Sequence, residues 1–270
     1  MTITINGQLL LCMLSEWLLT VPTLRLIQCN TDGITFICNR EYLEHARAVY
    51  KHWEKFTLLD LEEQEYSRMF IRDVNAYIAE KPNGKLKNKG AYAWKTRLEP
   101  NFHPDTHRDW HKDHGALIVP KAVEAYLIRG EDPRQFIINH QDPYDFMLLF
   151  KPGKDGKRIR LELGGEEIQQ TSRYYVTIQG GEMYKFMPPT GPEGHYKKSP
   201  KADKAAYESW DNSIYNPDLH TQNKSQHTTR KTSIQAGWLV TECNDMKNFN
   251  RDIINYEFYI AETMKLIEAV

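Results

Sequence analysis

The chain has few cysteines and no excess of charge of either sign. Its 270 residues include four cysteines with no C-x-x-C spacing. This excludes a disulfide scaffold and predicts a reducing, cytoplasmic compartment, the host cytoplasm if a phage encodes the chain. There are 35 Lys and Arg against 36 Asp and Glu, a formal net charge of -1. Any nucleic-acid surface must therefore come from local clustering of basic residues.

Long hydrophobic runs and the common catalytic motifs are also missing. The leucine-rich stretch 9–19 is interrupted by Ser15 and Glu16, is too short to cross a bilayer and lacks the pattern of a signal peptide, so we expect no membrane association. No P-loop, GxGxxG, HExxH or GxSxG pattern occurs, which excludes most NTPases, dehydrogenases, metalloproteases and hydrolases. The remaining mixture, 40% hydrophobic and 26% charged, is that of a globular chain with one or two domains.

The first hundred residues alternate between helix and strand patterns. Apolar residues at helical spacing predict a helix over 9–19, and Asn39 precedes a second helical stripe formed by Tyr42, Ala46, Val49 and Trp53. Between them, Asp32-Gly33 separates two apolar runs and predicts a hairpin. The predicted strands are 23–30, 34–38, 65–72, 74–79 and 86–94.

A polar, His-rich segment then predicts a linker, followed by a second domain. We expect helices over 118–129 and 133–139, and strands over 147–151, 158–163 and 174–178. A final helix lies within 250–270, with Ile254, Phe258, Ala261, Met264 and Ile267 on one face. The expected class is α+β: an antiparallel sheet with packed helices in 1–100, a linker in 101–115, and a mixed, mainly helical domain in 116–270.

Asp32 is the first candidate for chemistry. A carboxylate at the tip of a tight hairpin projects rigidly, as metal-dependent phosphoryl transfer requires. Most Asp-Gly pairs are simply turns, and turn formation alone explains both residues without any chemistry. The residues themselves leave the metal ligand as the second interpretation.

The second candidate is the basic segment 81–97, which contains six Lys or Arg residues and no acidic one. Lys85, Lys87 and Lys89 share one face of a strand, while Tyr92 and Trp94 have the opposite parity. Such a face suits a phosphate backbone, but lysines also protect exposed edge strands. A third cluster consists of four histidines, His103, His107, His111 and His114. Their spacing is compatible with a zinc site. The same segment is also explained as a polar linker with surface histidines.

These segments together resemble family B DNA polymerases of the bacteriophage type. Residues 26–34 (Leu-Ile-Gln-Cys-Asn-Thr-Asp-Gly-Ile) resemble the Asp-Thr-Asp hairpin of the polymerase palm, with Asn30 and Gly33 in place of the usual Asp and Ser. Residues 85–92 resemble the Lys-rich palm motif that grips the primer–template duplex. The stretches 115–122, 144–147, 171–175 and 237–244 resemble the thumb of phage enzymes.

The resemblance implies a role for each matched residue. Asp32 would bind Mg²⁺ in a two-metal site, and Asn30 and Thr31 would complete the catalytic hairpin. Arg173 and Lys185 would be weaker contacts of the thumb with DNA. The implied primer–template contacts are Lys85, Lys87, Lys89, Gly90 and Tyr92.

The resemblance also implies missing parts. The family needs a second palm aspartate, a fingers helix and an exonuclease, and no segment before Asp32 is long enough to hold them. We therefore expect the C-terminal half of a DNA-directed DNA polymerase, a nucleotidyltransferase of phage replication that binds DNA and dNTP and is inactive alone. A separately encoded N-terminal half would complete it. The alternatives are a non-catalytic DNA-binding subunit or relic and, less in keeping with the Lys-rich and thumb-like segments, a reverse transcriptase.

Overall fold

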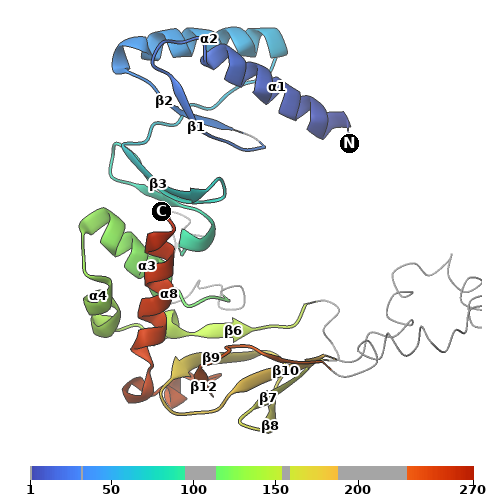
Figure 1. Ribbon diagram of the computed structural model, residues 1–270, viewed down its shortest axis with the longest axis vertical. Coiled ribbons are helices and arrows are strands. Elements are labelled where there is room, and N and C mark those ends of the chain that lie inside the picture. Colours follow the sequence, from blue (N-terminus) through green and yellow to red (C-terminus); the bar gives the residue numbers. More distant parts are fainter. Residues whose placement is uncertain (1, 32, 95–113, 154–158, 188–229) are drawn as a thin grey trace, which may run out of the picture. The chain divides into compact units, whose positions relative to one another are not determined.

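The computed structural model describes residues 2–31, 33–94, 114–153, 159–187 and 230–270 (Figure 1). The chain forms two compact units. Unit 1 comprises Met1–Thr96 and Leu266–Val270, and unit 2 comprises Arg97–Lys265. Helices and antiparallel sheets occur together, so the expected α+β class is confirmed. The division into 1–100, 101–115 and 116–270 stays a prediction. It places the last five residues in the second domain, whereas they belong to unit 1.

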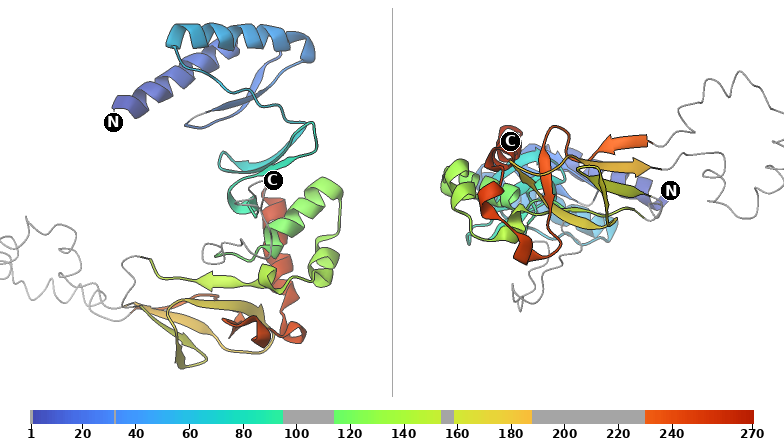
Figure 2. Two further views of the ribbon diagram at one scale, coloured as in Figure 1. Left: turned by 180° about the vertical axis from the view of Figure 1, so that it is seen from behind. Right: turned by 90° about the horizontal axis from the view of Figure 1, so that it is seen from below.

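Two helices cover a β-hairpin in unit 1. Helix α1 (Thr2–Leu18) leads into strands β1 (Arg25–Cys29) and β2 (Ile34–Ile37), and a short turn η1 (Arg40–Tyr42) precedes helix α2 (Leu43–Thr57). The hairpin and both helices confirm the sequence prediction, although α1 begins seven residues earlier than the leucine pattern. The two helices lie side by side in both Figure 1 and the left view of Figure 2.

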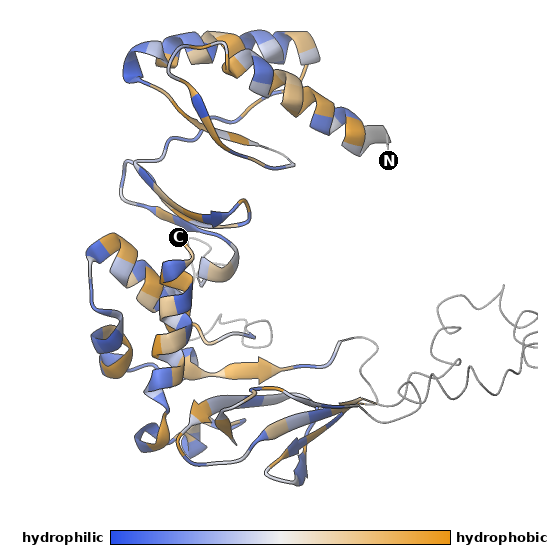
Figure 3. Cartoon of the chain, viewed as in Figure 1, coloured by the Kyte–Doolittle hydropathy of each residue, from blue (hydrophilic) through white to orange (hydrophobic). Residues whose placement is uncertain are grey.

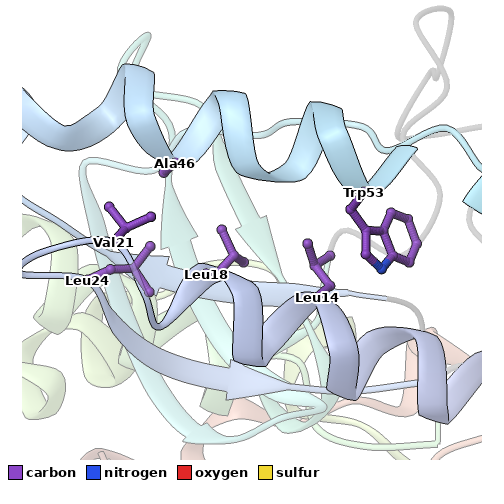
Figure 4. Close-up of a cluster of buried hydrophobic side chains, with 6 residues drawn as sticks. All are labelled: Leu14, Leu18, Val21, Leu24, Ala46 and Trp53. Carbon is purple, nitrogen blue, oxygen red and sulfur yellow. The ribbon is translucent and has the colours of Figure 1, made fainter. Parts of the chain in front are cut away.

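The core of this helix–hairpin layer is the cluster in Figure 4: Leu14, Leu18, Val21, Leu24, Ala46 and Trp53. Leu14 and Leu18 are one helical turn apart on α1, so their side chains lie on the same face of the helix and pack into this cluster. Trp53 is 2% exposed, and its indole N–H donates to the Leu10 carbonyl at 3.1 Å. Burial of each large apolar side chain contributes roughly 1.5–3 kcal/mol. Figure 3 shows hydrophobic and hydrophilic residues alternating along α2, as such a surface helix requires.

A separate three-stranded sheet completes unit 1. Its order is β3 (Arg68–Asp73), β4 (Ala76–Glu80), β5 (Leu86–Asn88), all antiparallel. The central strand β4 is buried over its first four residues. The prediction of a strand continuing to Trp94 is wrong, because the chain leaves the sheet after Asn88 and turns through η2 (Gly90–Tyr92).

The helices that open unit 2 follow the sequence prediction closely. Helix α3 (Ile118–Glu124) continues as a π-helical turn, η3 (Ala125–Arg129), and ends at Gly130. Helix α4 (Pro133–Asn139) has the predicted bounds, because the Asp132 carboxylate caps it by accepting from the Arg134 amide at 3.2 Å. Asp142 caps the following turn η4 (Pro143–Phe146) in the same way.

Unit 2 also contains two antiparallel sheets. The first has the order β12 (Leu239–Glu242), β9 (Ser172–Thr177), β6 (Leu148–Phe150), and β6 is hydrophobic throughout (Figure 3). The second has the order β11 (Arg230–Ser233), β10 (Met183–Met187), β7 (Arg160–Leu163), β8 (Glu166–Ile168). Strands β6, β7 and β9 were predicted. The other four were not.

Helix α8 (Tyr256–Glu268) follows two turns, η6 (Met246–Asn248) and η7 (Arg251–Ile253). The predicted inner face is partly wrong, because Met264 is 39% exposed whereas Tyr259 and Thr263 are fully buried. The Tyr259 hydroxyl accepts from the Val176 amide at 2.9 Å and donates to the Phe146 carbonyl at 2.8 Å. This one hydroxyl therefore hydrogen-bonds two backbone groups, one on β9 and one in η4, and links both to α8.

Candidate nucleic-acid interface

The β1–β2 hairpin brings the predicted catalytic segment to a tight reversal. Cys29 pairs with Ile34, and the Asn30 amide donates to the Gly33 carbonyl at 3.0 Å, which closes the end of the hairpin. Asn30 is half-buried and Thr31 is exposed. Asp32, the predicted metal ligand, lies outside the described residues.

The metal predictions fall mainly outside the described residues. His103, His107 and His111 belong to the part of the chain that is not described, and His114 is exposed. Within the described ranges, no group of three or more His, Cys, Asp and Glu side chains is arranged to hold a metal ion. Asn30 and Thr31 offer only an amide and a hydroxyl oxygen. The described residues alone do not form a Mg²⁺ site.

The three predicted lysines flank or occupy strand β5. Lys87 lies opposite Ala79 of the buried strand β4, and the Lys89 amide donates to the Tyr77 carbonyl at 2.9 Å. Lys85 precedes the strand and is exposed, as is Lys89, whereas Lys87 is half-buried. The two-residue spacing places the three lysines on the side of the sheet that also bears Tyr77. The basic segment is thus an edge strand with one cationic face.

Lys87 is the best-positioned cation of this face. Its Nζ donates to the Tyr66 hydroxyl at 3.2 Å and lies 5.9 Å from the centre of the Tyr66 ring. The hydrogen bond that Lys87 donates to Tyr66 raises the pKa of Lys87 above its ordinary value and outweighs the opposing effect of burial. Among the described residues, no carboxylate forms an ion pair with Lys87, so its charge is held in position by the tyrosine without being neutralised there. A phosphate group is the partner that such a fixed ammonium suits.

Gly90 and Tyr92 hold the end of this strand in place. Gly90 has φ +60°, and a Cβ at this position would lie 2.4 Å from the Asn75 carbonyl oxygen, so only glycine fits. Tyr92 is completely buried, and its hydroxyl donates to the Leu266 carbonyl at 3.0 Å. The prediction of direct DNA contact by Tyr92 is therefore replaced by a positioning role, because the side chain has no exposed surface.

The two predicted thumb contacts lie on different sheets of unit 2. Arg173 is in β9, where its amide donates to the Asn244 side chain at 2.8 Å and its carbonyl accepts from the Cys243 amide at 2.8 Å. Lys185 is in β10 and pairs with the buried Leu161 of β7. Both side chains are half-buried. The structure does not bring them together into one cationic surface.

A buried polar cluster in unit 2 was not predicted. The Asp145 side chain is 0% exposed, and its Oδ2 lies 2.5 Å from both Lys121 Nζ and His140 Nε2. Burial opposes ionisation, but the hydrogen bonds from His140 and Lys121 lower the pKa of Asp145. Its Oδ1 is buried and has no hydrogen-bond partner among the described residues.

His140 also lies at the edge of an open hollow of about 460 Å³, lined by residues of α4 and its flanks. Its ring stacks on Phe136 with centroids 5.7 Å apart, and its carbonyl accepts from Arg251 Nη2 at 2.5 Å. These contacts fix the imidazole between a buried carboxylate and the surface. The sequence around this cluster contains two Asp-Pro pairs, which cap α4 and η4. These pairs predict where the two elements begin, but they do not predict that Lys121, His140 and Asp145 meet.

Two further findings bear on what this chain is. Across the described ranges, no helix has the length and apolar character needed to cross a membrane. A comparison of the sequence with known protein families found no match, and a search among curated proteins found none either.

Proposed function

We propose that this chain is the C-terminal part of a phage-type DNA-directed DNA polymerase, the remainder of the palm followed by the thumb. The observation that carries the proposal is Lys87, a fixed and protonated side chain on the strand that resembles the family's Lys-rich motif. Its neighbours Lys85 and Lys89 extend the cationic face. A duplex backbone is the ligand for which successive unneutralised cations on one strand are best suited.

The hairpin supports the second half of the proposal. The Asn30 amide donates to the Gly33 carbonyl at the end of β1 and β2, within the segment that resembles the palm hairpin. In the proposed reaction the primer 3′-hydroxyl attacks the α-phosphate of a dNTP and releases pyrophosphate. Mg²⁺, held in part by Asp32, would supply charge neutralisation. The lysine face would keep the primer–template in register with the tip.

A two-metal site needs more than the single carboxylate of Asp32, since the metals lie about 3.5–4 Å apart and share carboxylates. We therefore propose that an N-terminal half, encoded separately, supplies the second palm aspartate, the fingers and the exonuclease. The chain would act in the cytoplasm of the host cell. Alone, it would bind DNA and make none.

The test is reconstitution with the product of the reading frame immediately upstream. Primer extension with Mg²⁺ and dNTPs should require both chains. Asp32→Asn keeps the size and turn preference of the residue but removes its charge. It should lower the extension rate by roughly two to three powers of ten, the scale of losing one key electrostatic contact.

Asn30→Asp is the matched control, because it changes the same hairpin and adds a charge; it should be tolerated. Robust synthesis by this chain alone would overturn the division into two halves. A reconstituted Asp32→Asn enzyme that works within a few-fold of the unaltered one would overturn the metal assignment. If that enzyme still bound DNA in a salt-dependent manner, the chain would be interpreted as a non-catalytic DNA-binding subunit.

A further inference from the structure

The four-stranded sheet of unit 2 has two chemically different faces. Leu161 of β7 and Met183 of β10 are buried and mark the inner face. Side chains alternate along a strand, so Arg160, Tyr184 and Phe186 point to the opposite face. The register places Phe186 directly between Arg160 on β7 and Lys231 on β11. Aromatic and cationic side chains from three adjacent strands therefore form one row.

The cations of this row lie against the aromatic rings. The Arg160 guanidinium carbon is 4.7 Å from the centre of the Phe186 ring, and Lys231 Nζ is 3.9 Å from the Tyr184 ring and 5.7 Å from the Phe186 ring. Lys231 is exposed and the rings are half-buried, so charge and ring edges are accessible together. We call these four residues, Arg160, Tyr184, Phe186 and Lys231, the Phe186 face.

Three carboxylates, Glu162, Glu167 and Glu182, lie beside the Phe186 face and engage Arg160 and the Tyr184 hydroxyl. Arg160 pairs with Glu162 at 2.7 Å and with Glu167 at 4.0 Å, and the Tyr184 hydroxyl donates to Glu182 at 2.5 Å. In the part of the chain that the structure describes, no ion pair joins Lys231 to a carboxylate. Lys231 is thus the cation of this row that is available to an incoming anion.

We propose that the Phe186 face binds single-stranded DNA, with bases stacking on Phe186 and Tyr184 and backbone phosphates pairing with Lys231 and Arg160. Aromatic rings interleaved with cations on an exposed sheet are the arrangement that recognises unpaired bases of any sequence. A duplex offers no free base faces to these rings. All four residues of the Phe186 face belong to unit 2; that the bound strand is the unpaired template rests on the proposed function.

The test uses the full chain and fluorescence anisotropy with a labelled oligo-dT strand, alongside a duplex of the same length. Phe186→Leu removes the aromatic face but keeps an apolar side chain, and it should weaken single-strand binding by about tenfold. Lys231→Gln should lower the log–log salt slope for the single strand by about 0.7. Phe186→Tyr keeps the ring and should keep the affinity, which separates loss of stacking from misfolding.

Tyr126→Leu and Lys247→Gln are the matched controls, since both residues are exposed and belong to other elements of unit 2. They should leave single-strand binding unchanged. A Phe186→Leu chain that binds oligo-dT within twofold of the unaltered chain overturns the proposal, as does an equal loss for single strand and duplex. Because no primer extension is measured, failure of the polymerase proposal leaves this result standing, and the reverse also holds.

Discussion

Lys87 and Lys121 are both half-buried, but the two units of the molecule use them in opposite ways. Lys121 lies against the buried carboxylate of Asp145, so its charge is matched inside the protein. Lys87 is held by a neutral tyrosine hydroxyl, so its charge is fixed in position and still available. Lys87 is therefore the better candidate ligand for phosphate of the two. The comparison can be tested by altering Asp145, the strand that bears Lys87, and each of the two lysines.

The largest effect is expected from Asp145→Ala. It leaves Lys121 and His140 partly buried without their shared acceptor, and loss of one partner of a buried pair costs about 3–5 kcal/mol. Urea unfolding of the full chain measures the loss. Glu257→Gln is the control, because it breaks the exposed pair with Arg134 and should change the unfolding free energy very little. A small effect of Asp145→Ala would mean that the cluster is not a source of stability.

Gly90→Ala should be the next most damaging change. The left-handed backbone costs a non-glycine residue about 1–2 kcal/mol, and the added Cβ would meet the Asn75 carbonyl oxygen at 2.4 Å. We expect a total loss of about 2–3 kcal/mol and displacement of the strand that bears Lys87. Gly84→Ala is matched, since Gly84 has φ +76° but nothing within 4 Å of an added Cβ. Equal losses for the two variants would show that the close approach at Gly90 is relaxed in solution.

A fall in pH should lower the free energy of unfolding because Asp145 becomes protonated. This loss should be smaller than the loss caused by Asp145→Ala or by Gly90→Ala. The folded pKa of this carboxyl is lowered, below an unfolded value of about 3.9. Its contribution to stability is therefore present above about pH 4 and is lost as the pH falls through the folded pKa. Asp145→Asn should flatten this part of the curve of unfolding free energy against pH. An unchanged slope in the variant would assign acid sensitivity to other carboxyl groups.

Lys87→Gln should have the smallest effect on stability and a clear effect on DNA. Loss of one hydrogen bond to Tyr66 costs about 1 kcal/mol, whereas loss of one phosphate contact lowers the log–log salt slope for primer–template duplex by about one. Lys121→Gln should do the reverse, with lower stability and an unchanged slope. If both variants leave the slope unchanged, the lysines of β5 only protect an exposed edge strand.

Local signals predicted much of this fold. Asp-Gly between two apolar runs located the hairpin, and the helix predicted over 133–139 has the bounds of α4. Strands β10, β11 and β12 were missed because they are defined by pairing across long sequence separations, as between Lys185 and Thr232. The end of β5 was misplaced because a strand pattern does not reveal that Gly90 approaches the backbone of β4 so closely.

The candidate sites divide in the same way. A run of lysines with no acidic residue is visible in the sequence, but the hydroxyl that orders Lys87 comes from Tyr66, 21 residues earlier. Lys121, His140 and Asp145 lie within an ordinary stretch of mixed composition, and only folding brings them to one carboxylate oxygen. The row formed by Arg160, Phe186 and Lys231 depends on the register of three strands. Registers of this kind follow from tertiary packing rather than from any short motif.

The hydrogen bond from Tyr92 to Leu266 sets an order of events during synthesis. The two residues are 174 positions apart, and a ribosome adding about 5–20 residues per second needs roughly 10 to 35 s to make the intervening chain. Throughout that time the Tyr92 hydroxyl has no Leu266 carbonyl to bind. All of unit 2 up to Lys265 leaves the ribosome before residues 266–270 of unit 1 do. The unit that begins first is thus completed last.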